Sequence, residues 1–342
     1  MSWFNTSGPC PNYVLYSKVR YTRNIAKQNF PHLLDRKREE ESISRLDTLL
    51  TSNGFRGETT VSGVTPAILS LAERQLIERD FVYSERRRAL YLNDPCNLMI
   101  AIGGDDFVSI SSVMPGLSVI EAKNMASEAE DMIDLEIAFA YSDQIGYLSS
   151  SPSRCGSCLT LSATLFLPSL KLTDSIEPLK GSLRLIGIDL APTFINTCGD
   201  LYTLSYTPHY LCDEDAATVR FSDTISAIVE KEKSDLGMIY SGKGKIIYAN
   251  ARRALGSLLY CESMSEEEML NALASIRLYH CICDDVKAGE LPGISELNFL
   301  SAEGLNASII ATSKDTCGSM EECERMRAEL FGRYIEHKSE VV

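Results

Sequence analysis

Two closely spaced cysteine pairs are the clearest candidates for redox or metal chemistry in this sequence. They are Cys155-Gly-Ser-Cys158 and Cys281-Ile-Cys283, in a chain with eleven cysteines. Four thiolates can hold zinc, and a C-x-x-C pair can form a reversible disulfide. Paired zinc knuckles normally carry two matched C-x-x-C units, however, and isolated cysteines often pack as small apolar side chains. The pattern favours reduced structural thiols, with a thiol or metal sensor on Cys155 and Cys158 as the alternative.

Ser151 is a candidate nucleophile in the Ser-, Cys- and Gly-rich stretch 149–158. A nucleophilic serine needs a general base, usually a histidine that is oriented by a carboxylate. The four histidines are scattered, and their spacing is typical of neither a catalytic triad nor a metal site; they are His32, His209, His280 and His337. A serine exposed on a loop is therefore the simpler interpretation.

Charged residues of possible chemical use gather in two segments. Lys18, Arg20 and Arg23 lie within one extended stretch, where they form either an anion clamp or a solvated strand edge. Asp105 and Asp106 follow two glycines, so they either capture a guanidinium group or form a turn, which these residue types favour. Fixed guanidinium groups are what phosphoryl transfer requires, because negative charge spreads over the phosphoryl oxygens in its transition state.

The elements that must position these residues mix strands and helices without strict βαβ alternation, which favours the α+β class. Strands are predicted at Tyr13–Tyr21, Ala89–Leu92, Leu98–Ile102, Phe107–Val113, Leu183–Leu190 and Leu201–Tyr206. Helices are predicted at Asp35–Leu50, Ser118–Tyr141, from Leu159 onward, and at Ile246–Leu259, Met269–Cys283 and Ser319–His337. The turn between the second and third strands indicates an antiparallel meander, and Ser265 with Glu268 predicts a capping box. Because the pattern after Gly237 is mostly helical, we expect a catalytic-type domain over 1–237 and a helical domain over 238–342.

Composition excludes some partners. The chain has 342 residues, a formal charge of -14 and a pI near 4.9, so its long-range field repels nucleic acid and anionic lipid. It has neither an apolar run long enough to span a membrane nor a secretory signal at its start. We expect a cytoplasmic protein that binds neither nucleic acid nor membrane.

Three segments in order resemble the phosphagen kinases, and in particular the bacterial protein-arginine kinases. Val14–Asn24 with Phe30-Pro31 resembles their opening signature, and Trp3 fits ahead of it. Asn97–Ile110 is similar to the segment that ends in Asn-Glu-Glu-Asp-His in the family, and Phe139–Pro168 resembles its Gly-Tyr-Leu-Thr-x-Cys-Pro-x-Asn-x-Gly-Thr-Gly-Leu-Arg stretch.

The helical end resembles the protein-arginine kinases and not the small-molecule phosphagen kinases. The segments that carry this likeness are Arg252–Gly256, Met269–Tyr279 and Glu296–Leu300. The resemblance implies an antiparallel sheet flanked by helices, a site for ATP with Mg formed by several arginines, and a carboxylate and a cysteine beside the guanidinium of a protein arginine. It also implies a C-terminal domain of the dimerisation or phosphoarginine-sensing type, in which Arg277 is the candidate sensor; its alternative is a surface arginine in an i, i+4 pair.

The sequence departs from the family at most positions that carry charge. Lys18 replaces one arginine of the Ser-Arg-x-Arg pair, and Arg20 keeps the other. Gly103–Phe107 aligns with Asn-Glu-Glu-Asp-His, so one glutamate is absent, Asp105 is a methylene shorter than the other, and the histidine is Phe107. A misplacement of about 1 Å in a reacting group can cost roughly 10²-fold in rate.

The third segment departs further. Ser151 stands in place of the family's cysteine, Arg154 in place of its asparagine, Cys158 in place of its second glycine and Thr160 in place of an arginine that reaches phosphate. The later Arg-Gly-x-x-Gly-Glu loop aligns only with Ile188–Thr193, which contains neither the arginine nor the glutamate. Arg154 lies close enough to Thr160 in sequence to compensate in part.

These observations give two hypotheses. In the first, the chain is a degenerate protein-arginine kinase, a pseudokinase that acts as a binding or regulatory subunit of a homodimer or of a heteromer with an active relative. In the second, it is an active ATP-dependent protein-arginine kinase with altered site residues. The candidate site residues are Asp105, Asp106 and Ser151 for catalysis and Lys18, Arg20, Arg23 and Arg154 for nucleotide. The expected partner of either form is a protein arginine or phosphoarginine.

Overall fold

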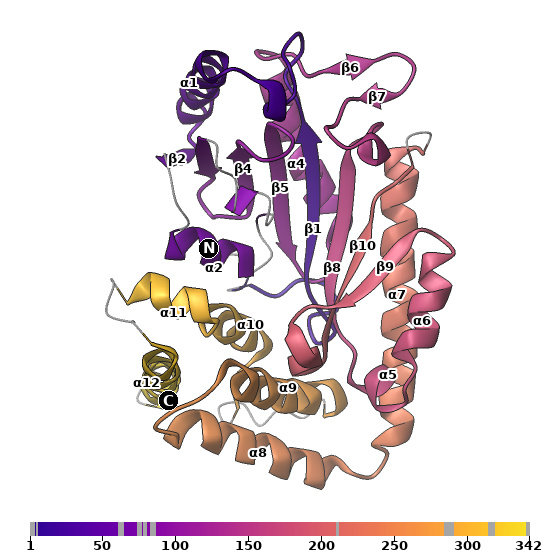
Figure 1. Cartoon of the computed structure of the whole chain (residues 1–342). Helices are drawn as coiled ribbons and strands as arrows, with labels where there is room; N and C mark the ends of the chain where they lie inside the picture. The colour runs from indigo at the N-terminus through magenta and orange to yellow at the C-terminus, as the bar shows by residue number, and fades with distance from the viewer. Residues whose placement is uncertain are drawn as a thin grey trace.

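The structure is a computed structural model. It describes residues 4, 6–60, 65–73, 77, 81–82, 87–209, 212–283, 291–313 and 319–339. A large sheet with helices on one face stands above a group of helices formed by the C-terminal part of the chain (Figure 1). Among the described residues, no helix is both long and apolar enough to cross a lipid bilayer.

The main sheet has eight strands in the order β2-β3-β4-β5-β1-β8-β10-β9, and all neighbouring strands are antiparallel. β1 lies at its centre, between β5 and β8. The strands are β1 (Val14–Arg23), β2 (Arg56–Thr60), β3 (Arg88–Leu92), β4 (Leu98–Ile102), β5 (Val108–Pro115), β8 (Leu159–Phe166), β9 (Ile188–Pro192) and β10 (Leu201–Tyr206). A separate hairpin consists of β6 (Tyr141–Ser142) and β7 (Gly146–Tyr147).

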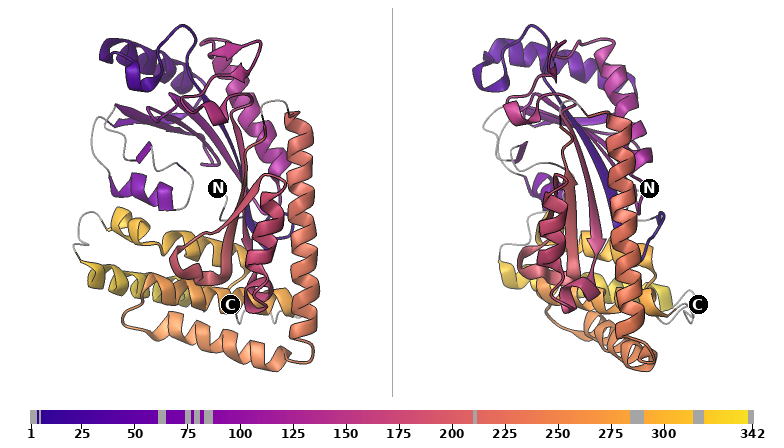
Figure 2. Two further views of the ribbon diagram at one scale, coloured as in Figure 1. Left: turned by 45° about the vertical axis from the view of Figure 1, so that its right-hand side comes forward. Right: turned by 90° about the vertical axis from the view of Figure 1, so that its right-hand side faces the viewer.

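Long helices cover one face of this sheet. The α-helices of the described chain as a whole are α1 (Arg36–Ser52), α2 (Pro66–Glu73), α4 (Val119–Asp134), α5 (Pro168–Leu172), α6 (Ile176–Arg184), α7 (Glu214–Ile239), α8 (Gly244–Tyr260), α9 (Glu266–Ile282), α10 (Ile294–Glu303), α11 (Asn306–Thr312) and α12 (Met320–Ser339). α4 and α7 lie along the same face, as Figure 2 shows. Val19 and Tyr21 of β1 join the core that these helices close, together with Leu161 of β8. Burying this apolar face is the main stabilising term for the sheet.

The opposite face of the sheet carries hydroxyl side chains. The hydroxyl groups of Ser109 and Ser111 on β5 and of Thr160, Ser162 and Thr164 on β8 lie on the face that α4 and α7 leave open, whereas the Ser112 hydroxyl points to the other face and donates to the Ala122 carbonyl of α4. Ser111 and Thr160 are the cross-strand neighbours of Arg20. Farther along, Thr203 Oγ1 lies 3.2 Å from Thr164 Oγ1 and 2.9 Å from that of Thr193. This open face is the part of the sheet that can meet a ligand.

The helices after α7 have a core of their own, centred on α8 and α9. α9 begins with the predicted capping box, in which the Ser265 hydroxyl accepts from the Glu268 N–H and the Glu268 carboxylate accepts from the Ser265 N–H. α8 is the outermost helix at this end of the molecule (Figure 1).

Arg277 of α9 connects this helical part to the sheet and to the N-terminal segment. Its guanidinium group donates to Asn298 Oδ1 of α10 and to the Pro11 carbonyl, and it lies 5.9 Å from the ring centroid of Phe166 on β8. The Asn12 amide also donates to a carbonyl of α9, at 2.8 Å. Arg277 is 4% exposed, and burial lowers the pKa of its guanidinium to about 10, which leaves the group charged at neutral pH. A buried charge of this kind depends on its hydrogen-bond acceptors.

The α+β class and the antiparallel meander, formed by β3, β4 and β5, are confirmed. The helix predicted from Leu159 is wrong, because the segment alternates with a period of two and forms β8. The strand predicted over Leu183–Leu190 is wrong in its first half, since α6 runs to Arg184 and β9 begins only at Ile188. The long α7 was not predicted.

Replacing Arg277 with Met should lower the free energy of unfolding by about 2 to 3 kcal/mol, because the buried Asn298 oxygen and the Pro11 carbonyl then lose their donor. Urea unfolding followed by circular dichroism measures the change. Arg325→Met, at an exposed position of α12, is the matched control and should change stability by less than about 0.5 kcal/mol. Equal effects of the two substitutions would contradict a structural role for Arg277.

Candidate functional site

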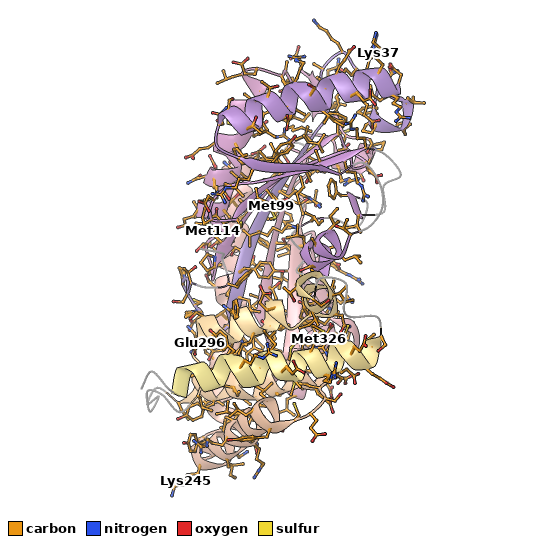
Figure 3. The ribbon with its side chains drawn as sticks, turned by 90° about the vertical axis from the view of Figure 1, so that its left-hand side faces the viewer. Lys37, Met99, Met114, Lys245, Glu296 and Met326 are labelled. Atoms are coloured by element: carbon orange, nitrogen blue, oxygen red, sulfur yellow. The ribbon has the colours of Figure 1, made fainter. Side chains whose placement is uncertain are left out.

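A small cavity lies on the open face of the sheet, where β1, β4 and β5 meet the loop before β8. It is lined by Arg20, Thr22, Ile77, Phe81, Met99, Ala101, Gly104, Asp106, Ser109, Ser111 and Arg154. Its volume is about 20 Å³, which is room for about one water molecule. Met99, one of these lining residues, belongs to β4 and is labelled in Figure 3. Of the predicted site residues, the structure therefore brings Arg20, Asp106 and Arg154 together.

β1 determines which of the predicted cations can reach this cavity. Residues two apart on a strand share a face, so Lys18, Arg20 and Thr22 lie on the open face. Arg20 Nη2 donates to the hydroxyl of Thr160, at 3.5 Å. Lys18, 6% exposed, lies one residue pair farther from the cavity and is not among its lining residues. The resemblance implies a further arginine at position 160. The residue there is Thr160, and it accepts a hydrogen bond from Arg20.

Arg23 lies on the other face of β1 and is held in a buried ion pair. Its Nε donates to Glu130 Oε1 of α4 at 2.9 Å, and Nη1 donates to the carbonyls of Thr22 and Ser157. The guanidinium carbon also lies 3.6 Å from the ring centroid of Tyr147. With 1% of its surface exposed, Arg23 stabilises the packing of α4 on the sheet and is separated from the cavity by the strand itself.

Asp106 is the hub of a buried polar network beside the cavity. Its carboxylate accepts hydrogen bonds from Asn24 Nδ2 at 2.8 Å, the Ser149 hydroxyl at 2.8 Å and the Ser150 N–H at 2.7 Å. Burial alone would raise the pKa of Asp106, but these donors hold the pKa below its ordinary value. The carboxylate is therefore ionised and fully engaged, and it fixes the 149–154 loop against the end of β1.

Asn24 completes this network. Its amide group donates to Leu148 as well as to Asp106, and its carbonyl oxygen accepts from the Phe107 N–H at 3.0 Å. Asp105, next to the hub, is exposed and does not line the cavity. The Gly-Gly-Asp-Asp turn that the sequence suggested is thus organised by Asp106, and Asp105 is the more exposed of its two aspartates.

The loop that Asp106 anchors carries both Ser151 and Arg154. Ser151 precedes a single 3-10 turn, Pro152–Arg154, and among the described residues its hydroxyl hydrogen bonds only to that of Ser153, at 3.0 Å. That geometry supplies no general base. The Arg154 side chain, in contrast, lines the cavity and makes no hydrogen bond or ion pair with any described residue, so its guanidinium group is available to a ligand.

Cys155 and Cys158 are not joined by a disulfide. Burial raises the pKa of Cys158 to about 12, which leaves it a protonated thiol of low reactivity at neutral pH. In the part of the chain that the structure describes, no three His, Cys, Asp or Glu side chains come together as a metal site would require.

Arg277 is buried in the contact of α9 with α10 and the N-terminal segment that is described above. Its guanidinium group faces a carbonyl, an amide oxygen and an aromatic ring, and it is buried. An anion would have to displace these contacts in order to reach it.

The hydroxyl groups of the open face were missed by sequence reasoning. Ser109 and Ser111 line the cavity, and their spacing of two within the strand Val108–Pro115 is the signal that could have identified them. The same alternation in Leu159–Phe166 would have identified the strand and the face of it on which Thr160 lies.

Comparison with known proteins assigns the fold and the family. The description "ATP:guanido phosphotransferase, C-terminal catalytic domain" matches residues 59–235, which is more than half of the chain. The chain belongs to this family. The match of the guanido phosphotransferase family spans β2 to α7 and thus contains most of the sheet and the loop that carries Arg154.

Curated relatives of this guanido phosphotransferase family member include protein-arginine kinases. That of Pelotomaculum thermopropionicum is 25% identical over 287 residues, which are 81% of this chain and 80% of the relative. That of Halothermothrix orenii is 26% identical over 285 residues, 81% of each chain.

Solved phosphagen kinases share the fold. The duplicated taurocyamine kinase from Schistosoma mansoni superimposes with a TM-score of 0.59 and 18% identity, over 79% of this chain and 40% of that one. Lombricine kinase gives a TM-score of 0.54 and 19% identity, over 66% and 67% of the two chains. The antiparallel sheet flanked by helices is thus the phosphagen kinase fold.

Replacing Asp106 with Asn should lower the free energy of unfolding by about 2 to 3 kcal/mol at pH 7, because an amide nitrogen then faces donors that have lost an acceptor. Since the folded-state pKa of Asp106 is lowered, its contribution is present above the unfolded-state pKa of about 4 and is lost as the pH falls through the folded-state value.

The stability difference between wild type and Asp106→Asn should therefore be largest near neutral pH and shrink below about pH 4. Denaturant unfolding at a series of pH values measures it. Asp105→Asn, at the exposed neighbouring position, is the control. A difference that stays constant down to pH 3 would contradict the role given to the Asp106 carboxylate.

Proposed function

We propose that this family member is a pseudokinase that acts as a binding or regulatory subunit. The observation that carries the proposal is the lining of the cavity. Arg20 and Arg154 are the two arginines among its described lining residues, whereas phosphoryl transfer depends on several fixed cations around the phosphates. Arg23 is committed to Glu130, and Thr160 to Arg20.

The described residues do not fit ATP with Mg. A cavity of about 20 Å³ is far smaller than a nucleotide. The Asp106 carboxylate already accepts three hydrogen bonds from the protein, which leaves it poorly suited as a metal ligand.

Capture of a substrate guanidinium group also lacks its expected carboxylate. Asp106 is buried and engaged, and Asp105 lies outside the cavity lining. Ser151 hydrogen bonds to Ser153, and no general base contacts it among the residues that the structure describes. The remaining chemistry of the cavity is that of two guanidinium groups and several hydroxyl groups, which suits binding of an anion better than turnover.

The protein-arginine kinases among its relatives suggest the kind of partner. We propose that the chain binds a protein arginine or phosphoarginine, in the cytoplasm, as a homodimer or together with an active relative. The domain division at residues 237 and 238 fits this proposal, because α7 ends at Ile239 and the helical core begins with Ile247 of α8. Arg277, buried between the two parts, is the least suitable of the candidate residues for sensing a phosphoarginine.

An active kinase with altered residues is the second candidate function. It is favoured by one observation, the convergence of Arg20, Arg154 and Asp106 on a single cavity. If the chain is an active kinase, Arg154 takes over the role of the arginine that the family has at the position of Thr160.

A thermal-shift titration with Mg-ATP and Mg-ADP separates the two candidates. A ligand at about 100 times its Kd stabilises the folded state by about 2.7 kcal/mol, which raises the melting temperature by several degrees. The pseudokinase proposal predicts no nucleotide-dependent shift up to several millimolar. A shift that Arg20→Ala and Arg154→Ala both abolish would contradict it.

Transfer of labelled phosphate from ATP to arginine in a protein is the second measurement. Transfer at a rate typical of kinases, about 1 to 100 per second, lost in Arg154→Ala and retained in Lys37→Ala, would establish the active kinase instead. Lys37 is an exposed residue of α1, distant from the cavity.

A further inference from the structure

The outer surface of α8 is the basic part of an acidic protein. Between Leu236 and Cys261 the sequence has four cations and no carboxylate, so all 47 acidic residues lie elsewhere. The cations are Lys243, Lys245, Arg252 and Arg253, and all four are exposed. Figure 3 labels Lys245 at the foot of the molecule, at the opposite end from Lys37. This charge separation gives α8 a local potential that differs in sign from that of the chain as a whole.

Helix stability does not explain the two lysines at the start of α8, Lys243 and Lys245. The N-terminus of a helix carries a partial positive charge, so lysines there are unfavourable and acidic residues favourable. The other helices of comparable length, α1, α4, α7, α9 and α12, each have an acidic residue in the first turn. α8 has none, and its N-cap residue, Lys243, makes no side-chain cap. A carboxylate of a partner molecule would supply the negative charge that the N-terminus of α8 lacks.

Apolar side chains flank the cations. Ile246 is 62% exposed and Tyr260 is 83% exposed, and at 1.5 Å per residue they are about 21 Å apart along the helix. Ala249 and Gly256 lie between them on the same side, so no large side chain blocks the approach of a second helix there. The inner side of α8 is occupied by α9 and α12.

We propose that the basic face of α8, defined as Lys243, Lys245, Arg252 and Arg253 with Ile246 and Tyr260, binds an acidic amphipathic helix of a partner protein. Carboxylates of this helix pair with the four cations, and apolar side chains near its two ends cover Ile246 and Tyr260. Charge complementarity supports this occupant, because electrostatic matching steers association and suppresses wrong partners.

Other occupants fit less well. Nucleic acid and anionic bilayers are extended and meet the field of the whole acidic chain, which repels them. A partner helix is compact enough to meet mainly the local charges, since interactions are screened over about 8 Å at physiological salt. A second copy across a two-fold axis would bring α8 against α8 and oppose like charges.

The test uses the full chain and a fluorescein-labelled helical peptide about as long as α8, with leucine near each end and glutamates on the same face. Fluorescence anisotropy should detect binding that weakens as NaCl rises from about 50 to about 200 mM. A peptide with lysine in place of every glutamate should not bind. Comparable binding of the two peptides would overturn the proposal.

Matched charge reversals locate the site. Lys245→Glu and Arg253→Glu should each weaken binding of the acidic peptide by about threefold to tenfold, and Tyr260→Ser should weaken it as well. Lys37→Glu, the same change on an exposed helix at the opposite end, should have an effect of less than about twofold. Equal losses in Lys37→Glu would overturn the proposal, because the peptide would then be sensing net charge alone.

Two further measurements exclude the other occupants. Sedimentation equilibrium that shows a dimer dissociated by Lys245→Glu would assign the face to a second copy. Binding to phosphatidylglycerol vesicles, lost in the same variant, without binding to the acidic peptide would assign it to a membrane. The site on the sheet is independent of α8, so Lys245→Glu should leave the response to Mg-ATP unchanged whether or not the proposed function is correct.

Discussion

The two-residue period of the central strand β1 is the constraint on which the rest of the structure depends. It sends Val19, Tyr21 and Arg23 toward α4 and α7, and it leaves Lys18 and Arg20 on the open face. A cation on the first face must be paired because it is buried, whereas on the second face Arg20 lines the cavity and the buried Lys18 does not. The position of a residue along β1 therefore decides whether its charge serves the fold or the site.

The same period explains what the sequence could and could not predict. The meander of β3, β4 and β5 follows from short apolar runs and a turn, and the capping box at Ser265 follows from local spacing. The strand β8 was mistaken for a helix because its period of two was overlooked. The pairing of Arg23 with Glu130, 107 residues later in the chain, has no local signal. Such a contact depends on the tertiary structure and cannot be predicted from secondary-structure propensity or from the spacing of residues in the sequence.

The candidate site divides in a similar way. The resemblance to the guanido phosphotransferases directed attention to Arg20, Asp106 and Arg154, which line one cavity. The resemblance could not reveal that the Asp106 carboxylate accepts hydrogen bonds from Asn24, Ser149 and Ser150. A carboxylate that accepts three hydrogen bonds from the protein holds loops in place. An aspartate whose oxygens were free to accept could instead bind a guanidinium group or a metal. Function at this position depends on neighbours, which only the folded chain reveals.

The hydroxyl groups of the open face have a consequence for any anion that approaches it. A guanidinium group that already donates a hydrogen bond within the protein must exchange that bond for one to the ligand, so the net gain in free energy is smaller. Here Thr160 accepts from Arg20, and Thr164, Thr203 and Thr193 interact with one another. An anion that binds at Arg20 therefore competes with a hydroxyl group of the neighbouring strand.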